Sequence, residues 1–322
     1  MRNAGIMESE SSREASRILL ADTHGFRSMT LRILRVRLMA SLLLGLCLIH
    51  PLVAEEPSQG EAKNQAQATA SSGAQPAADN SQVSSDLAKQ SQNPIASLIS
   101  LPFQNNMNFG VGETDRIQNT LNIQPVLPFQ LSGSVNFIAR TIIPVVRQPI
   151  GIDESKNGLG DISFSGFFSP AKPGKLIWGV GPAILLKTAT DGALGTGKWS
   201  AGPSVVALTM PGPWVIGALF SNVWSFAGDA DRGDVNVMTF QYFINYNMKK
   251  GWYLSSAPIL TSNWEADAGE KWVIPFGGGV GKVFRIGSQP LNGSVQAFWN
   301  AKHPEQGASW TLRLQLVFLF PK

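Results

Sequence analysis

The sequence contains almost no cysteine. Its one cysteine, Cys47, lies in an apolar stretch near the start of the chain. Disulfides, thiol nucleophiles and cysteine-ligated metal sites all require cysteines, so the rest of the chain uses none of these. A lipoprotein signal would need a small residue where Leu46 stands. We therefore expect a chain with no cofactor and no metal site.

The sequence also lacks long hydrophobic runs and an excess of charge. From Pro94 onward no apolar run approaches the eighteen or so residues of a transmembrane helix. Only 15% of the residues are charged, and the net charge of +4 arises mainly in residues 1–54, which hold seven basic and four acidic residues. The remaining chain has nineteen basic against eighteen acidic residues, which gives no electrostatic case for nucleic-acid binding.

The beginning of the chain has the pattern of an export signal. Arg32, Arg35 and Arg37 precede the apolar run 38–49, and Ala54 is followed by acidic residues. A basic region, a short apolar core and a small residue are typical of a secretory signal peptide. We predict an N-terminal extension and signal peptide over residues 1–54, cleaved after Ala54. A buried core helix is the alternative.

Residues 55–93 are rich in Ala, Gln, Ser and Asn and have no aromatic residue. Such a segment buries too little apolar surface to offset the entropy lost on ordering. The composition predicts a disordered linker, followed by one domain over residues 94–322.

Residues 94–322 are dominated by the alternation of apolar and polar residues that is typical of β-strands. In the last one, Leu312, Leu314 and Leu316 alternate with Arg313 and Gln315. Twelve such strands are predicted, an even number, and each is long enough to cross a membrane. Their ranges are 103–112, 116–127, 131–147, 158–169, 176–188, 198–210, 214–227, 235–248, 252–262, 272–286, 290–302 and 308–320.

The predicted connections between these strands are of two alternating kinds. One kind is short or carries proline and lysine: 127–130, 169–175, 211–213, 249–251 and 287–289. The other is mostly longer and acidic: 113–116, 148–157, 189–197, 228–234, 263–271 and 303–307. An outer-membrane barrel has short periplasmic turns and long outer loops. The pattern therefore predicts an all-β, antiparallel transmembrane barrel in a Gram-negative outer membrane, with both barrel termini periplasmic.

Six tryptophans near predicted strand ends favour an aromatic girdle at the membrane interfaces over a packed soluble core: Trp214, Trp252, Trp264, Trp272, Trp299 and Trp310. A membrane barrel must put its apolar face towards lipid, so its polar face lines the interior. A soluble barrel would invert the two faces, and strand periodicity alone does not separate these cases. In the membrane case, the candidate lumen-lining residues are Gln118, Asn122, Arg140, Asp161, Gln241, Asn245, Gln296 and Arg313.

Asp161 is the only acidic residue that falls within a predicted strand. A carboxylate on an inward face is costly unless it is hydrated or paired. We hypothesise a lumenal ion pair with Arg140 on the preceding strand; the alternative is a solvated residue at the rim.

Three motifs suggest chemistry but do not meet its requirements. The glycines of 277–282 lack the first glycine and the Ser/Thr of a phosphate-binding loop. Asp229, Asp231 and Asp234 lack the calcium-binding EF-hand spacing. His303 has no nucleophile motif beside it. We predict no catalytic residue.

Several segments together resemble a family of bacterial outer-membrane barrels that are labelled as transporters and sometimes mislabelled neuromedin U. This family is similar to the phenol-degradation MetA-pathway barrels. The matching segments are 93–104, 158–161, 224–226, 272–277, 281–282 and 310–313. The resemblance covers most of residues 93–322 and implies a barrel that takes part in transport. Pro321 and Lys322 at the end depart from the terminal aromatic residue of typical outer-membrane barrels.

The sequence thus predicts a channel or transporter for small molecules, hydrophobic ones included, with a polar lumen and acidic outer loops. The expected partners are outer-membrane lipid, a small-molecule solute and the barrel-assembly machinery that inserts the protein, with no nucleic acid. One alternative is a structural or adhesive surface barrel with a plugged lumen. The other is an outer-membrane hydrolase that uses His303.

Overall fold

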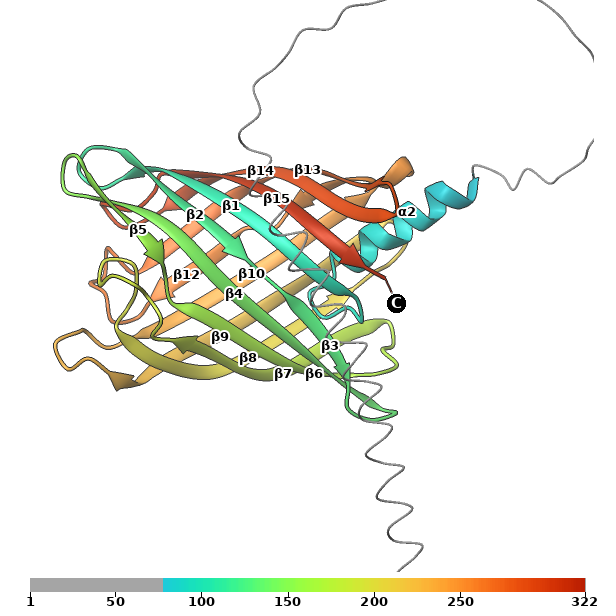
Figure 1. The fold of residues 1–322 in the computed structure, drawn as a ribbon, viewed down its shortest axis with the longest axis horizontal. Coiled ribbons are helices and arrows are strands. Elements are labelled where there is room, and N and C mark those ends of the chain that lie inside the picture. Colours follow the sequence, from blue (N-terminus) through green and yellow to red (C-terminus); the bar gives the residue numbers. More distant parts are fainter. Residues whose placement is uncertain (1–77, 322) are drawn as a thin grey trace, which may run out of the picture. The chain divides into compact units, whose positions relative to one another are not determined.

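A computed structural model describes residues 78–321, which form one antiparallel sheet and a helix (Figure 1). The predicted signal peptide lies outside the described residues, as does the linker up to residue 77. Fifteen strand segments are hydrogen-bonded in a ring, because β10 (Asn236–Asn247) pairs with β9 (Trp214–Gly228) as well as with the next segments along the chain.

Three positions in the wall of this ring are each built from two consecutive segments. The pairs are β2 (Arg116–Ile123) with β3 (Val126–Gln130), β5 (Glu154–Leu159) with β6 (Ile162–Pro170), and β11 (Trp252–Ser256) with β12 (Ile259–Asn263). Fifteen segments less three give twelve strands, so the predicted closed twelve-stranded barrel is confirmed.

The other strands agree with the predicted ranges to within about four residues at either end. They are β1 (Ile99–Val111), β4 (Val135–Ile150), β7 (Leu176–Leu186), β8 (Lys198–Thr209), β13 (Trp272–Ile286), β14 (Gln289–Lys302) and β15 (Trp310–Phe320). The prediction of a connection at residues 127–130 is wrong, because these residues belong to β3. Pro128 is tolerated there since β3 contacts β1 only at Val126 and pairs along its length with β4 alone, so the missing N–H leaves no partner unpaired.

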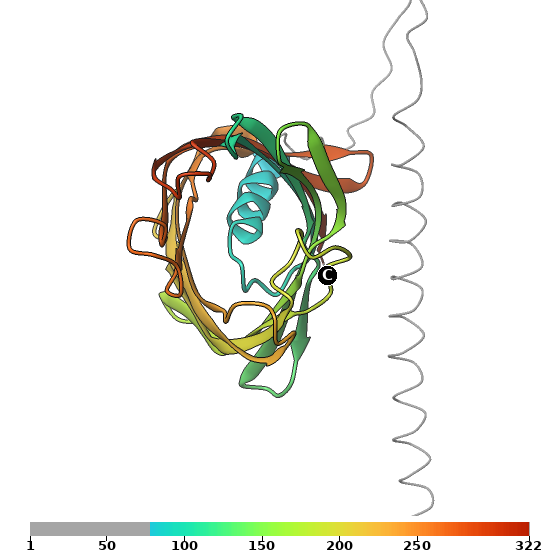
Figure 2. The ribbon, with the colours of Figure 1, turned by 90° about the vertical axis from the view of Figure 1, so that its left-hand side faces the viewer.

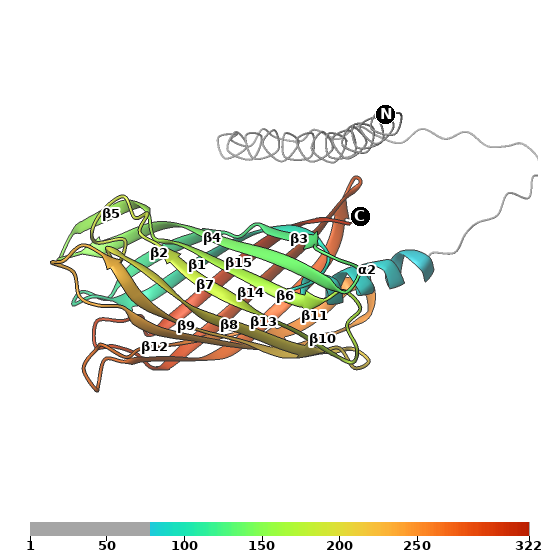
Figure 3. The ribbon, with the colours of Figure 1, turned by 90° about the horizontal axis from the view of Figure 1, so that it is seen from below.

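The two ends of the barrel differ. At the turn end, five short connections join the strands: 131–134, 171–175, 210–213, 248–251 with the 3-10 turn η2 (Lys249–Gly251), and 287–288. At the loop end, the connections are 112–115, 151–153, 187–197, 229–235, 264–271 and 303–309. Figures 1 and 3 show the helix α2 (Ala78–Ser91) at the turn end and β5 at the loop end.

The side chains are distributed as in a membrane barrel and not as in a soluble one. Large apolar side chains such as Trp178, Phe220 and Leu254 are exposed on the outer face. Polar side chains are buried on the inner face, among them Gln104, Gln124, Ser204, Asn245, Asn292, Gln296, Asn300 and Arg313. This arrangement is favourable in a lipid bilayer. In water, the exposed apolar side chains of the outer face would raise the free energy of the folded protein.

The end of the predicted disordered linker is ordered instead. Residues 78–91 form α2, and the chain continues into β1. Figure 2 shows this helix within the ring of strands. The prediction of disorder over the whole of 55–93 is therefore wrong for its last part. The reason is that the barrel supplies apolar surface that the segment cannot supply itself: Leu87 and Ala88 are buried against Val283 of β13.

Candidate functional site: the barrel lumen

Five of the predicted lumen residues surround one cavity of about 150 Å³ inside the barrel, near the turn end. They come from four strands that are separated along the chain: Arg140 from β4, Gln241 and Asn245 from β10, Gln296 from β14 and Arg313 from β15. Alternation places each of them at an inward position of its strand, and closure of the barrel brings them around one cavity.

Gln118 and Asn122 lie on the same inward face of β2, nearer the loop end. Gln118 accepts a hydrogen bond from Asn108 Nδ2 at 2.7 Å and donates one to Gln148. Asn122 is half-buried opposite Gln104 of β1. These amides line the part of the lumen that is nearer the loop end.

Arg313 separates this cavity from a second one. The second cavity, of about 370 Å³, lies on the loop side and includes Arg313, Asn106 and Thr120 in its lining. The guanidinium donates from Nε to Asn106 Oδ1 at 3.0 Å and from Nη1 to the Ala257 carbonyl at 2.9 Å. It also lies over the Phe298 ring, 4.7 Å from its centroid. With 6% of its surface exposed, Arg313 is fixed at the boundary of the two chambers.

The Ala257 carbonyl is available to Arg313 because the wall is interrupted there. β11 pairs with β13 as far as Ser255 opposite Gly279, and β12 resumes at Thr261 opposite Val273. The register is the same on both sides, so the five positions 256–260 and 274–278 face each other without ladder hydrogen bonds. Pro258 and Pro275, which have no N–H to donate, lie within this interruption.

Arg140 and Asp161 do not form the predicted ion pair. Arg140 donates from Nη2 to Gln124 Oε1 at 2.9 Å, and no carboxylate contacts it among the described residues. Asp161 lies in the break between β5 and β6 at the loop end, outside any strand, so its assignment to a strand is also wrong. Ser165, not Asp161, is the residue opposite Arg140 in the ladder.

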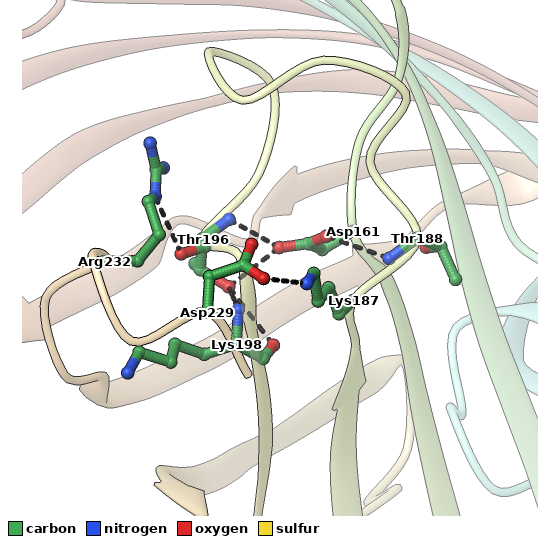
Figure 4. Close-up of polar contacts among 7 residues, drawn as sticks. All are labelled: Asp161, Lys187, Thr188, Thr196, Lys198, Asp229 and Arg232. Carbon is green, nitrogen blue, oxygen red and sulfur yellow. Dashed lines mark hydrogen bonds and ion pairs between the residues drawn. The ribbon is translucent and has the colours of Figure 1, made fainter. Parts of the chain in front are cut away.

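Asp161 instead organises the longest loop of the barrel, residues 187–197 (Figure 4). Its Oδ1 accepts the backbone N–H groups of Thr188 and Ala189, each at 3.1 Å. Its Oδ2 accepts the N–H of Thr196 at 2.6 Å and the hydroxyl of Thr196 at 2.8 Å. Four donors satisfy a half-buried carboxylate without a counter-ion.

Further charges hold the same loop from the side. Arg232 donates to the carbonyls of Thr196 at 3.2 Å and Gly195 at 2.6 Å, while Lys187 pairs with Asp229 (Figure 4). The Asp229–Asp234 cluster is therefore used in ion pairs and loop contacts. Within residues 78–321, no group of three or more His, Cys, Asp or Glu side chains is placed to hold a metal ion.

The turn end of the lumen is filled by residues 85–98, which we call the inserted segment. Gln92 exchanges two hydrogen bonds with Asn247, at 2.9 and 3.0 Å. Ser91 accepts a hydrogen bond from Asn292 at 2.9 Å, and Lys89 donates to the Gly212 carbonyl at 2.6 Å. The segment thus contacts three separate parts of the wall.

Sequence reasoning missed the apolar half of the lumen. Ile95 of the inserted segment is buried in a cluster of inward side chains from the wall: Val126, Ile138, Phe167, Ile177, Val206, Leu208, Val215, Leu219 and Phe243. These positions alternate with outward apolar ones, so their strands read as continuous apolar runs. The signal was present in short runs of apolar and small residues such as 205–208 and 215–219, although serines such as Ser169 and Ser204 also occupy inward positions of β6 and β8.

The glycine-rich stretch 277–282 lies within β13 and forms no loop around a ligand. The hydrogen bond described for His303 joins its Nδ1 to the carbonyl of its neighbour Pro304 at 2.7 Å. Among the described residues there is no helix both long and apolar enough to cross a membrane.

A closed antiparallel ring with an apolar outside and a polar, partly filled inside defines an outer-membrane β-barrel. Known proteins share this fold. An outer-membrane channel of the COG4313 group from Pseudomonas putida F1 is 13% identical with a TM-score of 0.54; the match covers 69% of this chain and 94% of that one. No protein-family profile and no curated protein sequence matches.

Two more distant structures are the NanC porin and the CymD monoaromatic hydrocarbon channel. NanC is 10% identical, with a TM-score of 0.45 over 69% of this chain and 100% of its own. CymD is 10% identical, with a TM-score of 0.40 over 70% of this chain and 88% of its own. The likeness to the Pseudomonas putida channel, at 13% identity, is one of fold, and it confirms the resemblance to outer-membrane barrels that the sequence indicated.

Proposed function

We propose that this protein is an outer-membrane channel for small molecules, with the turn end and both barrel termini in the periplasm. The observation that carries the proposal is the pair of polar-lined chambers along the barrel axis, which meet at Arg313. A barrel that served only as a scaffold would gain stability from an apolar, close-packed interior. Buried amides and guanidiniums are costly unless they are hydrogen-bonded to the protein or to water, and the hydrogen bonds described for Arg140 and Arg313 leave N–H groups for water in the lumen.

The acidic loops supply a second argument. Every carboxylate of residues 99–321 lies at the loop end, in the loops, in the β4–β5 hairpin or at Asp161. Such a rim creates an electrostatic vestibule around the outer mouth, which attracts or repels solutes before they enter.

The inserted segment favours a second candidate, a barrel whose lumen is permanently plugged and whose function lies in its loops. Its hydrogen bonds to Asn247, Asn292 and Gly212 fix it in place. The two candidates differ in one respect: a channel requires the segment to move or to leave a path beside it, whereas a structural barrel does not.

Conductance with the segment free and with it tethered separates these candidates. Gln92 and Asn247, whose side chains are hydrogen-bonded, are replaced together by cysteine (Q92C/N247C) and joined by a short bismaleimide. In planar bilayers the untreated double variant should conduct, and the joined form should lose at least about 90% of its current. The two single-cysteine variants, treated identically, should keep their currents.

A folded protein that never conducts, treated or untreated, refutes the channel and leaves the structural barrel. Equal currents before and after joining would instead show that solutes pass beside a fixed segment. Folding is checked in each case by heat-modifiable gel mobility.

A further inference from the structure

Two arginines line the two lumen cavities, and neither has an acidic partner among the described residues. Arg140 and Arg313 both line the 150 Å³ cavity, and Arg313 also lines the 370 Å³ chamber. Neither lining includes an Asp or Glu, and none of the ion pairs among the described residues involves these arginines. Asp86 of α2 is exposed and lines neither cavity.

Most of the donor groups on the two guanidiniums are unused by the protein. Each guanidinium has five N–H groups. The hydrogen bonds described for Arg313 use two of them, on Asn106 and Ala257, and the bond of Arg140 to Gln124 uses one. Seven of the ten N–H groups therefore have no protein acceptor among the described residues and require water or a solute.

The rest of the cavity is neutral and has an apolar side. Amide side chains of Gln104, Gln241 and Gln296 surround the guanidiniums, while Val126, Phe243 and Val317 contribute apolar surface. A cavity of comparable volume in an engineered protein, about 150 Å³, holds one benzene ring. The space therefore suits a solute of one ring or a short chain.

We propose that this cavity is a binding site for small monocarboxylates with an apolar body, of about the size of benzoate. The planar fork of an arginine matches a carboxylate through two parallel hydrogen bonds, and the surrounding low dielectric strengthens the attraction. Without a neighbouring carboxylate, the constriction attracts anions and repels cations. This inference deepens the proposed channel function and rests on it for the passage of the solute, though not for its binding.

Binding is tested on the full-length protein in detergent, with benzoate and its neutral analogue benzamide as probes. Calorimetric titration should show benzoate bound at least about tenfold more tightly than benzamide. The variants R140Q and R313Q should each lower benzoate affinity at least about tenfold and leave benzamide unchanged. R147Q is the matched control, because Arg147 also lies on β4 but is exposed on the outer face near the loop end.

Selectivity is tested in planar bilayers under a tenfold KCl gradient. The reversal potential should show chloride preferred over potassium at least about threefold in the natural protein and in R147Q. This preference should fall to near unity in R140Q/R313Q, while R313K should retain part of it. Benzoate, but not benzamide, should reduce the current.

Equal binding of benzoate and benzamide, or equal loss of binding in R147Q, overturns the inference. A cation-preferring current that R140Q/R313Q leaves unchanged does so too. Benzoate binding without any current would instead sustain the site and refute the channel, so the two failures are distinguishable.

Discussion

At the scale of single residues, Asp161 shows how one carboxylate can fix a loop. It accepts hydrogen bonds from Thr188, Ala189 and Thr196, which lie 27 to 35 residues further along the chain. Both oxygens are occupied by donors that have no other acceptor of equal strength. The loop 187–197 therefore depends on the charge of this side chain and on both of its oxygens.

Asp161→Asn should loosen the loop without unfolding the barrel. An amide oxygen replaces one carboxylate oxygen, but the amide NH₂ cannot accept, so two donors lose their partner at roughly 1–3 kcal/mol each. We expect external protease to cleave the loop at least about tenfold faster on intact cells. Asp267→Asn in the exposed loop 264–271 is the control and should change nothing. Equal cleavage of both variants would contradict this role.

At the scale of elements, β13 is shaped by its glycines. A Cβ on Gly279 would lie 1.9 Å from the Val295 carbonyl oxygen of β14, far inside van der Waals contact. A Cβ on Gly277 would lie 2.0 Å from the Ala297 carbonyl, and this residue has φ of +155°, which L side chains rarely adopt. The strand therefore approaches β14 closely just where its pairing with β11 and β12 is interrupted.

Gly279→Ala should prevent or weaken closure of the barrel, because the clash is with backbone atoms that cannot rotate away. We expect the heat-modifiable, folded fraction to fall at least about threefold after refolding into detergent. Gly293→Ala on the adjacent β14 is the matched control, since its Cβ would meet only the Phe284 ring edge at 3.4 Å. A folded fraction for G279A equal to that of G293A would show that the wall adapts.

The sequence predicted the elements well and their long-range contacts poorly. Alternation located the twelve strands and the inward positions of Arg140 and Arg313, because period two is a local property. It did not predict the donors of Asp161, which depend on the path of a loop. It also missed α2, because a helix with few apolar residues becomes stable only through surface that the barrel provides.

At the scale of the whole molecule, the decisive feature is that the apolar face is outside. Leu314 and Gln315 are neighbours near the middle of β15; Leu314 is exposed on the outer face and Gln315 lines the lumen cavity. Adjacent residues of this strand thus face lipid on one side and the water of the lumen on the other.

Leu314→Lys should destabilise the barrel in bilayers by about 2–4 kcal/mol, the cost of a charge at the lipid-facing midplane. Gln315→Lys should cost much less, because its ammonium group enters the hydrated lumen. Urea titration of folded protein in lipid vesicles measures both. A larger loss for Q315K than for L314K would place lipid on the wrong face and remove the basis of the channel proposal.

The inserted segment leads directly into β1, and β1 pairs with β15 from Ile99 to Phe109. Leu98, the last residue of the segment, packs against Val317 and Leu319 on that partner strand. The segment that occupies the lumen and the first strand of the barrel, which pairs with the last strand, are thus one continuous piece of chain. We therefore expect the pairing of β1 with β15 to place the segment in the lumen, and removal of the segment from the lumen to weaken that pairing. Closure of the barrel and filling of its lumen by the inserted segment are therefore coupled.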